Sequence, residues 1–408
     1  MTLDGMPSPG PSLSAWRFVT VFGTVSLLAD VVYEGARSIT GPLLASLGAT
    51  ALVVGLVTGI GEAAALALRV VSGPLTDRTQ RFWAWTIAGY ALTVVTVPFL
   101  GVTATLWVAC ALVIAERVGK AVRSPAKDTL LSHATHVTGR GVGFAVHEAL
   151  DQIGAMLGPL TVAGMLVLTG GDYGPALGVL AAPGTAVLAL LIWLRWRVPR
   201  PSEYEPVDRD RQADGSPVTT RAPLPREFWL YCAFTATTMV GFATFGVLSF
   251  HMVTRGLLPP AAVPVIYAAA MAADAVAALA SGWLYDRVGP VTLAALPVLA
   301  LIIPTVAFTN DVTLVIAGAL AWGAAVGIQE STLRAVVADL VAPPRRATAY
   351  GLFAAGMGAA TAAGGALTGW LYDTSVPALI ATVAGVQLVA VALAAVALRR
   401  RRAATTAR

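Results

Sequence analysis

The sequence predicts an all-α integral membrane protein. Of its 408 residues, 57% are hydrophobic and only 12% are charged, and the mean hydropathy is +0.74, which is far more apolar than a soluble domain. Apolar stretches of about 20 residues or more recur along the chain, and a helix of that length crosses a hydrocarbon core of roughly 30 Å. The two cysteines, Cys110 and Cys232, lie inside apolar runs and support neither a disulfide framework nor a metal site. A soluble enzyme is therefore excluded.

Twelve transmembrane helices are expected, six in each half of the chain. Residues 1–17 lack the basic start and cleavage site of a secretory signal and are expected to form a cytoplasmic tail. The first bundle, 18–195, has spans at 18–47, 50–75, 82–102, 105–131, 139–169 and 174–195. The polar, proline-rich segment 196–226 is expected to be a flexible cytoplasmic linker. The second bundle, 227–399, has spans at 227–256, 261–285, 289–309, 311–340, 345–373 and 376–399, and a basic tail, 400–408, follows.

The cationic residues predict the orientation of these spans. With the N-terminus in the cytoplasm, nineteen loop and tail arginines lie on the cytoplasmic side and Arg255 alone lies on the other, as the positive-inside rule requires. Both termini are therefore expected in the cytoplasm, in a multi-pass protein of the cell membrane. The formal charge of +5 is attributed to this topology and not to nucleic-acid binding. We expect a monomer in the lipid bilayer.

The two halves repeat one another, which is typical of transporters built by duplication. Gly73, Asp77 and Arg78 end the second span, and Gly282, Asp286 and Arg287 end the eighth at the same spacing. Arg123 and Asp128 likewise correspond to Arg334 and Asp339. The pentapeptide Gly-Trp-Leu-Tyr-Asp occurs at 282–286 and at 369–373, on opposite membrane sides. An inverted three-span repeat would produce this pattern, and chance similarity at helix ends is the alternative.

With these motifs the sequence resembles the major facilitator superfamily over essentially its whole length. The segment 73–81 resembles the loop signature of that family, although Gln80 replaces a glycine, and Gly154, Gly158 and Pro159 resemble a motif of its proton-exchanging exporters. The segment 116–128 resembles a signature of one bacterial subgroup. The resemblance implies two six-helix bundles related by a pseudo-two-fold axis, a small-molecule substrate and alternating access. The expected conformational-switch residues are Gly73, Asp77, Arg78, Arg81, Asp128, Gly154, Gly158, Pro159, Gly282, Asp286, Arg287 and Asp339.

Seven cations lie within the expected spans. At about 2.5–3.5 kcal/mol for each lipid-facing charge, they would cost on the order of 20 kcal/mol, more than the roughly 5–15 kcal/mol that stabilises a fold. Lys127 is expected to extend to the cytoplasmic surface, and the others must face a wet cavity or an acidic partner. The expected cavity residues are Arg37, Arg69, Arg117, Lys120, Arg123, His147, Gln329, Glu330 and Arg334.

Acidic residues within the spans are candidates for proton coupling. Asp30, Glu34 and Arg37 stand at i, i+4 and i+7 and so share one helix face. We expect Asp30 and Glu34 to carry the coupling proton, with Arg37 and Arg117 tuning them, because burial disfavours a charged carboxylate and a nearby guanidinium favours it. The other candidates are Glu62, Glu116, Glu148, Asp151 and Asp274.

The sequence contains no nucleotide-binding loop and no soluble catalytic domain, so an ion gradient is the expected energy source. The leading hypothesis is a secondary active transporter that exports a small molecule in exchange for protons, with no cofactor. One alternative is proton-coupled uptake, or transport of an organic anion or metal chelate, favoured by the basic stripe Lys120, Arg123 and Arg334. Another is a membrane receptor or assembly factor that has kept the fold without transport.

Overall fold

The computed structural model describes residues 13–204, 224–341 and 345–406, and all its regular elements in these ranges are helical. The first half contains α1 (Ala15–Ser46), α2 (Ala51–Ala67), α3 (Arg69–Thr79), α4 (Phe82–Val102), α5 (Leu106–Thr138), α6 (Arg140–Leu168), α7 (Tyr173–Gly178), α8 (Ala181–Arg197) and the 3-10 helix η1 (Pro201–Tyr204). The second half contains α9 (Arg226–Val240), α10 (Phe245–Thr254), α11 (Ala262–Val288), the 3-10 helix η3 (Gly289–Ala294), α12 (Ala295–Ala307), α13 (Val312–Leu340), α14 (Arg346–Thr374) and α15 (Val376–Thr406).

Some predicted features lie outside the described residues. These are the tail 1–12, the central part of the linker, 205–223, and the end of the basic tail, 407–408. The side chains of Arg334 and Asp339 also lie outside them, although both positions belong to α13.

The helices form twelve spans, which confirms the predicted fold class. Three spans consist of two successive helices, namely α2 with α3, α7 with α8 and α9 with α10. Within the described ranges, nine spans are long and apolar enough to cross a membrane by composition alone, and the other three contain α5, α12 and α14. α5 is more polar because Glu116, Arg117, Lys120 and Arg123 fall within it. The last helix continues to Thr406, beyond the predicted end of its span at 399.

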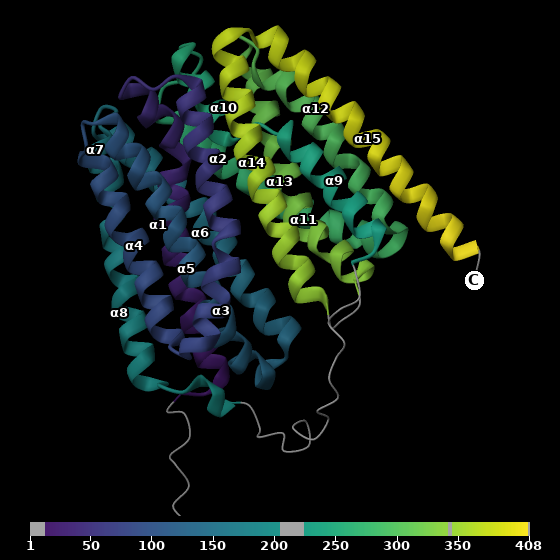
Figure 1. Cartoon of the computed structure of the whole chain (residues 1–408). Helices are drawn as coiled ribbons and strands as arrows, with labels where there is room; N and C mark the ends of the chain where they lie inside the picture. The colour runs from purple at the N-terminus through teal and green to yellow at the C-terminus, as the bar shows by residue number, and fades with distance from the viewer. Residues whose placement is uncertain (1–12, 205–223, 342–344, 407–408) are drawn as a thin grey trace, which may run out of the picture.

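The two halves lie side by side, in contact from one end to the middle of the molecule and separated at the other end (Figure 1). We call the end that carries the start of α1, the end of α8 and η1 the linker end, and the other the opposite end. At the opposite end α2 packs along α14, and α10 packs against α1, while towards the linker end the halves separate. One hydrophobic core runs through both halves, and a second core around Phe18, Phe22 and Trp83 lies in the first half near the linker end.

Glycines allow the two halves to approach closely at the opposite end. A Cβ atom on Gly55 of α2 would collide with the carbonyl oxygen of Gly365 in α14, and one on Gly365 with that of Gly55. A Cβ on Gly41 of α1 would likewise collide with the carbonyl oxygen of Gly246 in α10. Small residues at such crossings let membrane helices pack backbone to backbone. The opposite end is therefore packed shut in this conformation.

Asp373, at the end of α14, adds a polar contact to this packing. Its carboxylate accepts the backbone N–H groups of Ala51, at 3.0 Å, and Leu52, at 2.8 Å, at the start of α2. Thr50 accepts the N–H of Val53 at 3.3 Å. The first three N–H groups of α2 have no partner within the helix, so a residue of the other half supplies the acceptor for two of them.

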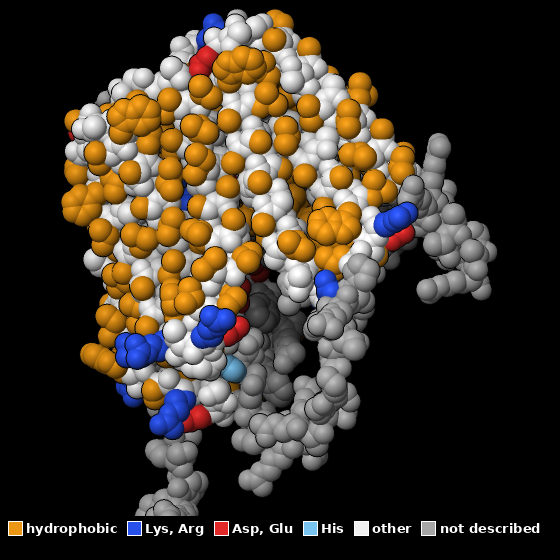
Figure 2. Space-filling model, in the orientation of Figure 1, with side chains coloured by type: hydrophobic (Ala, Val, Ile, Leu, Met, Phe, Trp, Pro, Cys, Tyr) orange, Lys and Arg blue, Asp and Glu red, His pale blue; other side chains and the backbone are white. Residues whose placement is uncertain are grey.

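The surface of the molecule is that of a membrane protein. Hydrophobic side chains cover most of the visible face, and charged side chains gather towards its ends (Figure 2). Large apolar side chains such as Phe99, Trp107, Leu168 and Leu279 are more than half exposed. Such a broad apolar surface would be unfavourable in water, and a bilayer solvates it.

Candidate substrate cavity and ion-pair network

A cavity of about 970 Å³ lies between the two halves. It extends from Thr58 and Thr244, next to the packed opposite end, to Gly73 and Asp77 near the end of α3. Figure 2 shows the hollow between the halves on the side of the linker end. The cavity is therefore open towards the linker end and closed at the opposite end.

The two walls of the cavity differ in chemistry. The first half contributes four cations, Arg37, Arg69, Arg117 and Lys120, and the acids Glu62 and Asp77. The second half contributes mostly apolar and aromatic side chains together with some polar ones; they include Met239, Phe242, Phe245, Trp322, Phe353, Met357, Gln329 and Glu330. A ligand in the cavity would thus contact a charged wall on one side and an aromatic wall on the other.

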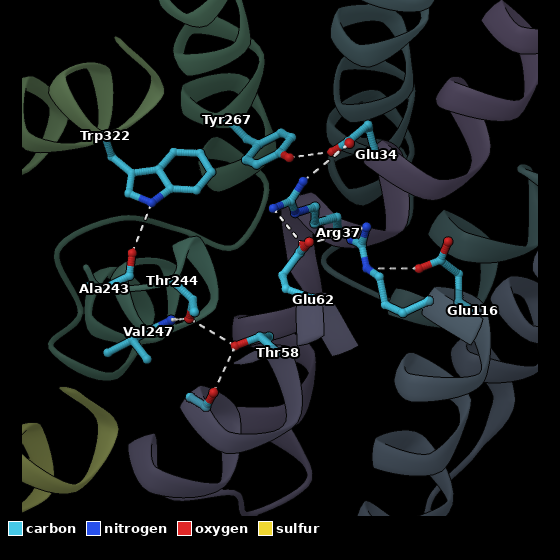
Figure 3. A network of polar contacts seen from close by, with 12 residues as sticks. Glu34, Arg37, Thr58, Glu62, Glu116, Ala243, Thr244, Val247, Tyr267 and Trp322 are labelled. Atoms are coloured by element: carbon cyan, nitrogen blue, oxygen red, sulfur yellow. Dashed lines mark hydrogen bonds and ion pairs between the residues drawn. The ribbon is translucent and has the colours of Figure 1, made fainter. Parts of the chain in front are cut away.

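An ion-pair network occupies the charged wall (Figure 3). Arg37 Nη1 lies 3.4 Å from Glu34 Oε1, and Arg37 Nη2 lies 2.9 Å from Glu62 Oε1. Arg117 Nη1 lies 3.7 Å from the same Glu62 oxygen, and Arg117 Nε lies 3.1 Å from Glu116 Oε2. Three acids and two guanidinium groups from α1, α2 and α5 thus neutralise most of one another's charge, which offsets the cost of placing them inside the membrane.

One contact joins this network to the second half. The hydroxyl of Tyr267, on α11, donates a hydrogen bond to Glu34 Oε2. The Tyr267 ring packs on Phe245 with centroids 4.6 Å apart, and Phe245 lies 5.2 Å from Trp322. Glu34 is 5% exposed, so its carboxylate is held between Arg37 of its own half and Tyr267 of the other.

A helix break brings the aromatic wall to the cavity. α9 ends at Val240 and α10 begins at Phe245, and residues 242–244 between them line the cavity. Non-helical backbone in a membrane must find hydrogen-bond partners. The indole Nε1–H of Trp322 donates to the carbonyl oxygen of Ala243 at 3.0 Å, and the Thr244 hydroxyl lies 2.9 Å from that of Thr58. The break is thereby stabilised by side chains from both halves.

These uncharged residues were not predicted from the sequence, because charged side chains within the spans were taken as the signal for the cavity. Two signals were available. Trp322 lies in the middle of its span, whereas a membrane-anchoring Trp lies near an end. The stretch 237–244 places threonine and glycine in the middle of another span, which favours a helix break.

The basic residues Lys120 and Arg123 of α5 lie in different surroundings. Lys120 lines the cavity, with Nζ 4.7 Å from the centroid of the Tyr33 ring. Arg123 is 4% exposed and lies behind the wall, where Nη1 donates to Thr93 Oγ1 at 2.9 Å and the guanidinium stacks on Tyr90 and Tyr33. Arg123 was expected in the cavity lining; in this conformation the two tyrosine rings hold it away from the cavity.

A second buried cluster lies between α1, α5 and α6. Lys127 Nζ lies 3.1 Å from His147 Nε2 and 3.6 Å from Asp151 Oδ2, and the Ser26 hydroxyl lies 3.1 Å from the same His147 nitrogen. Lys127 was expected to reach the surface, and this was wrong: its side chain is 18% exposed because Asp151 pairs with it. Neither His147 nor Asp30, which is 8% exposed, lines the cavity.

The other predicted acids are dispersed. Glu148 is exposed on α6. Asp274 is 3% exposed and lies against Gln152 of α6, where the two halves meet. In the described part of the chain, no group of three His, Cys, Asp or Glu side chains is placed to hold a metal ion.

The predicted switch residues lie mainly at the linker end. Asp77, Arg78, Arg81, Asp128, Asp286 and Arg287 are exposed. Arg287 stacks on Trp283, its Cζ atom 3.7 Å from the ring centroid. Among the described residues no ion pair links Asp77 or Arg78 to the second half, because the halves are separated here. A Cβ at Gly73 or Gly282 would meet open space.

Gly154 and Gly158 allow α6 to approach α1 within the first half. A Cβ at Gly154 would collide with the carbonyl oxygen of Leu27, and one at Gly158 with that of Val31. Pro159 follows inside α6 and is buried. The exporter-like motif thus lies in the packing between α1, which carries Glu34 and Arg37, and α6.

Similar proteins are known in bacteria and archaea. An uncharacterized protein of Mycobacterium tuberculosis (strain ATCC 25618 / H37Rv) is 70% identical over 396 residues, covering 96% of each chain. An uncharacterized MFS-type transporter of Methanocaldococcus jannaschii is 25% identical over 371 residues, covering 88% of this chain and 89% of the relative.

Solved transporter structures share the fold at low sequence identity. A mutant of the nucleoside transporter NupG superposes with a TM-score of 0.75 at 13% identity, covering 93% of this chain and 99% of that one. A POT family transporter in complex with 5-aminolevulinic acid gives 0.71 at 12% identity, covering 94% and 95%. A bacterial homolog of the human lysosomal transporter Spinster, inward-facing and occupied, gives 0.67 at 15% identity, covering 93% and 96%.

The family model described as Major Facilitator Superfamily matches residues 26–309 and 258–408. With the two six-helix halves and the cavity between them, this match identifies the chain as a multi-pass membrane transporter, not an enzyme, of the Major Facilitator Superfamily.

Proposed function

We propose that the protein is a secondary active transporter that exports a small molecule in exchange for protons by alternating access. The observation that carries the proposal is the position of Glu34, which contacts Arg37 in its own half and Tyr267 in the other. A proton on this carboxylate weakens its attraction to Arg37 and changes its contact across the interface. Loading of the proton and separation of the halves are thereby coupled at one residue.

The proposed proton site is Glu34, with Asp30 as the second acid on the same helix. Glu62 holds Arg37 and Arg117 in reach of the cavity. When the carboxylate of Glu34 is protonated, Glu62 becomes the remaining acidic partner of Arg37. The cluster of Lys127, His147 and Asp151 is the rival site, and it lies away from the cavity lining.

The proposed orientation places the linker end in the cytoplasm of a cell-membrane protein. Loop and tail arginines gather at that end, and the excess of cations is typical of cytoplasmic loops. The cavity would then be inward-open. In the alternate conformation the linker end closes, and we propose that Asp77 and Arg78 then pair with the corresponding region of the second half around Asp286 and Arg287.

Transport in everted membrane vesicles tests the direction and the coupling ion. When the lumen is acidified, an exporter that exchanges substrate for protons accumulates substrate inside, and protons leave in proportion. Both fluxes are measured over a panel of aromatic and aliphatic small molecules. Accumulation driven only by the reverse gradient would show uptake, and the absence of substrate-dependent proton flux across the panel would favour a receptor.

Carboxylate variants test the proton site. Glu34→Gln should abolish pH-driven accumulation and preserve substrate exchange without a gradient. Glu227→Gln, at an exposed position at the start of α9, is the matched control and should transport like the wild type. If the double variant Asp30→Asn, Glu34→Gln still concentrates substrate against a gradient, neither acid carries the proton.

A further inference from the structure

Lys120 differs from two other cations of the cavity wall. Arg37 lies within 4 Å of Glu34 and Glu62, and Arg117 within 4 Å of Glu62 and Glu116. In the described ranges no carboxylate oxygen forms an ion pair with Lys120 Nζ, which instead faces the Tyr33 ring at 4.7 Å. An ammonium group in a membrane cavity that lacks a fixed anion has an open position for a mobile one.

A second cation, Arg117, lines the same cavity. Arg117 is 5% exposed. Its Nη1 atom is buried and has no hydrogen-bond partner among the described residues, because Glu62 Oε1 lies 3.7 Å away. A buried donor without an acceptor is unfavourable. An anionic ligand would supply that acceptor, and Lys120 is one helical turn away from Arg117 on α5.

The use of lysine at this position is itself informative. The chain contains only two lysines, Lys120 and Lys127, and its other twenty-five basic residues are arginines. Both lysines lie within the span formed by α5, and Lys127 is paired with Asp151. A lysine ammonium is a compact point charge, whereas a guanidinium requires a planar, forked partner. At position 120 the compact charge fits an anionic group approaching from the cavity.

The facing wall provides an apolar surface suited to a ring. Phe242, Phe245 and Trp322 line the cavity, with Trp322 6.4 Å and 5.2 Å from the two phenylalanine centroids. Trp322 is fixed by its hydrogen bond to Ala243. Figure 3 shows Trp322 and Tyr267 on one side and the ionic side chains on the other. Aromatic groups arranged in this way favour edge-to-face and offset contacts with an incoming ring.

The acids next to the cavity are engaged with the guanidinium groups rather than with Lys120. Arg37 and Arg117 pair with Glu34, Glu62 and Glu116, and Asp77 lies near the mouth of the cavity at the end of α3. A single negative group next to Lys120 would therefore act as its counter-ion.

We propose that the cavity binds an organic monoanion with an aromatic body, its carboxylate or similar group on Lys120 and Arg117 Nη1 and its ring on Phe242, Phe245 and Trp322. The inference rests on the proposed function, because it takes the cavity between the halves as the substrate site. It selects the organic anion from the substrate classes that the sequence left open, and it applies to either direction of transport.

Binding to the purified full-length protein tests the class without requiring transport. The probes are 1-naphthaleneacetate, 1-naphthaleneacetamide and 2-(1-naphthyl)ethylammonium, which share one ring system and carry a charge of minus one, zero and plus one. Isothermal titration in nanodiscs should give at least tenfold tighter binding for the acetate than for the amide, with the ammonium weakest. Equal binding of acetate and amide, tightest binding of the ammonium, or no binding of any probe at millimolar concentration would each overturn the proposal.

Variants test which residues cause the tighter binding of the acetate than of the amide. Lys120→Gln should remove the acetate-to-amide preference, with the amide Kd within about twofold of the wild type, and Lys120→Arg should retain part of it. Trp322→Leu should weaken the acetate and amide equally. Arg195→Gln, an exposed position at the end of α8, is the control and should change neither Kd. A preference that survives Lys120→Gln overturns the assignment. Acetate-selective binding without probe-dependent proton flux would overturn the proposed proton exchange and leave the proposed substrate class standing.

Discussion

Removing the carboxylate of Asp373 should open the opposite end of the molecule. This residue accepts two N–H groups of α2 from the other half, at 3.0 and 2.8 Å. The contact exists only while α14 lies against α2. In a conformation with this end open, both N–H groups return to water, and Asp373 no longer stabilises the helix start. Asp373→Ala therefore destabilises the present conformation selectively.

The expected size of the effect follows from helix capping. Loss of a side-chain cap costs about 0.5–2 kcal/mol, and a negative charge at a helix N-terminus contributes about 0.3–1 kcal/mol. Because Asp373 is exposed to solvent, a value near 1.4 kcal/mol is appropriate, which corresponds to tenfold in an equilibrium constant. Asp373→Ala should therefore raise the ratio of open to closed opposite ends about tenfold. Asp373→Asn keeps an acceptor oxygen but loses the charge, and should raise it roughly two- to fivefold.

Distance measurements between spin labels report this ratio. Labels at Ser46 and Thr254, both exposed at the opposite end and in different halves, are introduced after Cys110 and Cys232 are replaced by alanine. Asp311→Ala is the matched control, because Asp311 also accepts two N–H groups, those of Thr313 and Leu314, but within one half. The control should lower the melting temperature and leave the label distances unchanged. If Asp373→Ala leaves the distance distribution unchanged as well, the cap does not bias the conformation.

Three further substitutions test the packing and the network. Gly365→Leu should prevent the close approach of α14 to α2 and reduce transport at least tenfold, whereas Gly356→Ala, which meets open space on the same helix, should transport normally. Glu62→Gln should lower the free energy of unfolding by about 1–2 kcal/mol, a value reduced because the Glu62 side chain is 26% exposed. In a double-mutant cycle measured by thermal unfolding, Glu62→Gln combined with Arg37→Gln should lose less free energy of unfolding than the sum of the two single losses. Tyr267→Phe should uncouple the fluxes, giving fewer protons per substrate in liposomes, and an unchanged ratio would remove its hydrogen bond to Glu34 from the mechanism.

The fold could be predicted because each span satisfies a length requirement that the bilayer imposes on any sequence. α5 shows that this prediction did not depend on apolarity alone. Its segment 106–123 contains four charged residues, yet the surrounding spans and the repeat required a helix there. The helix breaks within spans, such as residues 241–244 between α9 and α10, were not predicted, because their stability depends on tertiary partners such as Trp322.

Helical spacing predicted which residues share a face but not the depth at which each one lies. Asp30 and Arg37 are on one face of α1, but seven residues separate them by ~10 Å along the helix axis. Arg37 therefore meets Glu62 at the cavity, whereas Asp30 lies outside the cavity lining. The same reasoning explains why Lys120 reaches the cavity while Lys127, on the same helix, pairs with Asp151. Whether a residue on that face reaches the cavity depends on the positions of the neighbouring helices, and a single sequence does not determine these positions.

Asp373 shows a different limit. Asp286 was predicted as a switch residue because it corresponds to Asp77, and the pentapeptide repeat places Asp373 at the position equivalent to Asp286. In the present conformation Asp286 is exposed at the linker end, where the halves are apart, and Asp373 caps α2 at the opposite end, where they touch. An inverted repeat places equivalent residues at opposite ends of the molecule. The copy that is engaged therefore depends on which end is closed, and sequence alone does not specify that.

Glu34 and the packed opposite end are mechanically connected through α1. Gly41, which packs on Gly246 of α10, lies seven residues after Glu34, so both project from nearly the same face of one continuous helix, ~10 Å apart. Separation of α1 from α10 at Gly41 must therefore also draw Glu34 away from Tyr267. In the proposed cycle Glu34 takes up a proton while the opposite end is open and the carboxylate is away from Tyr267, and it releases the proton after this end closes, because the contacts with Tyr267 and Arg37 stabilise the charged carboxylate. The interface contact and the proton site are thus coupled by the rigidity of a single helix.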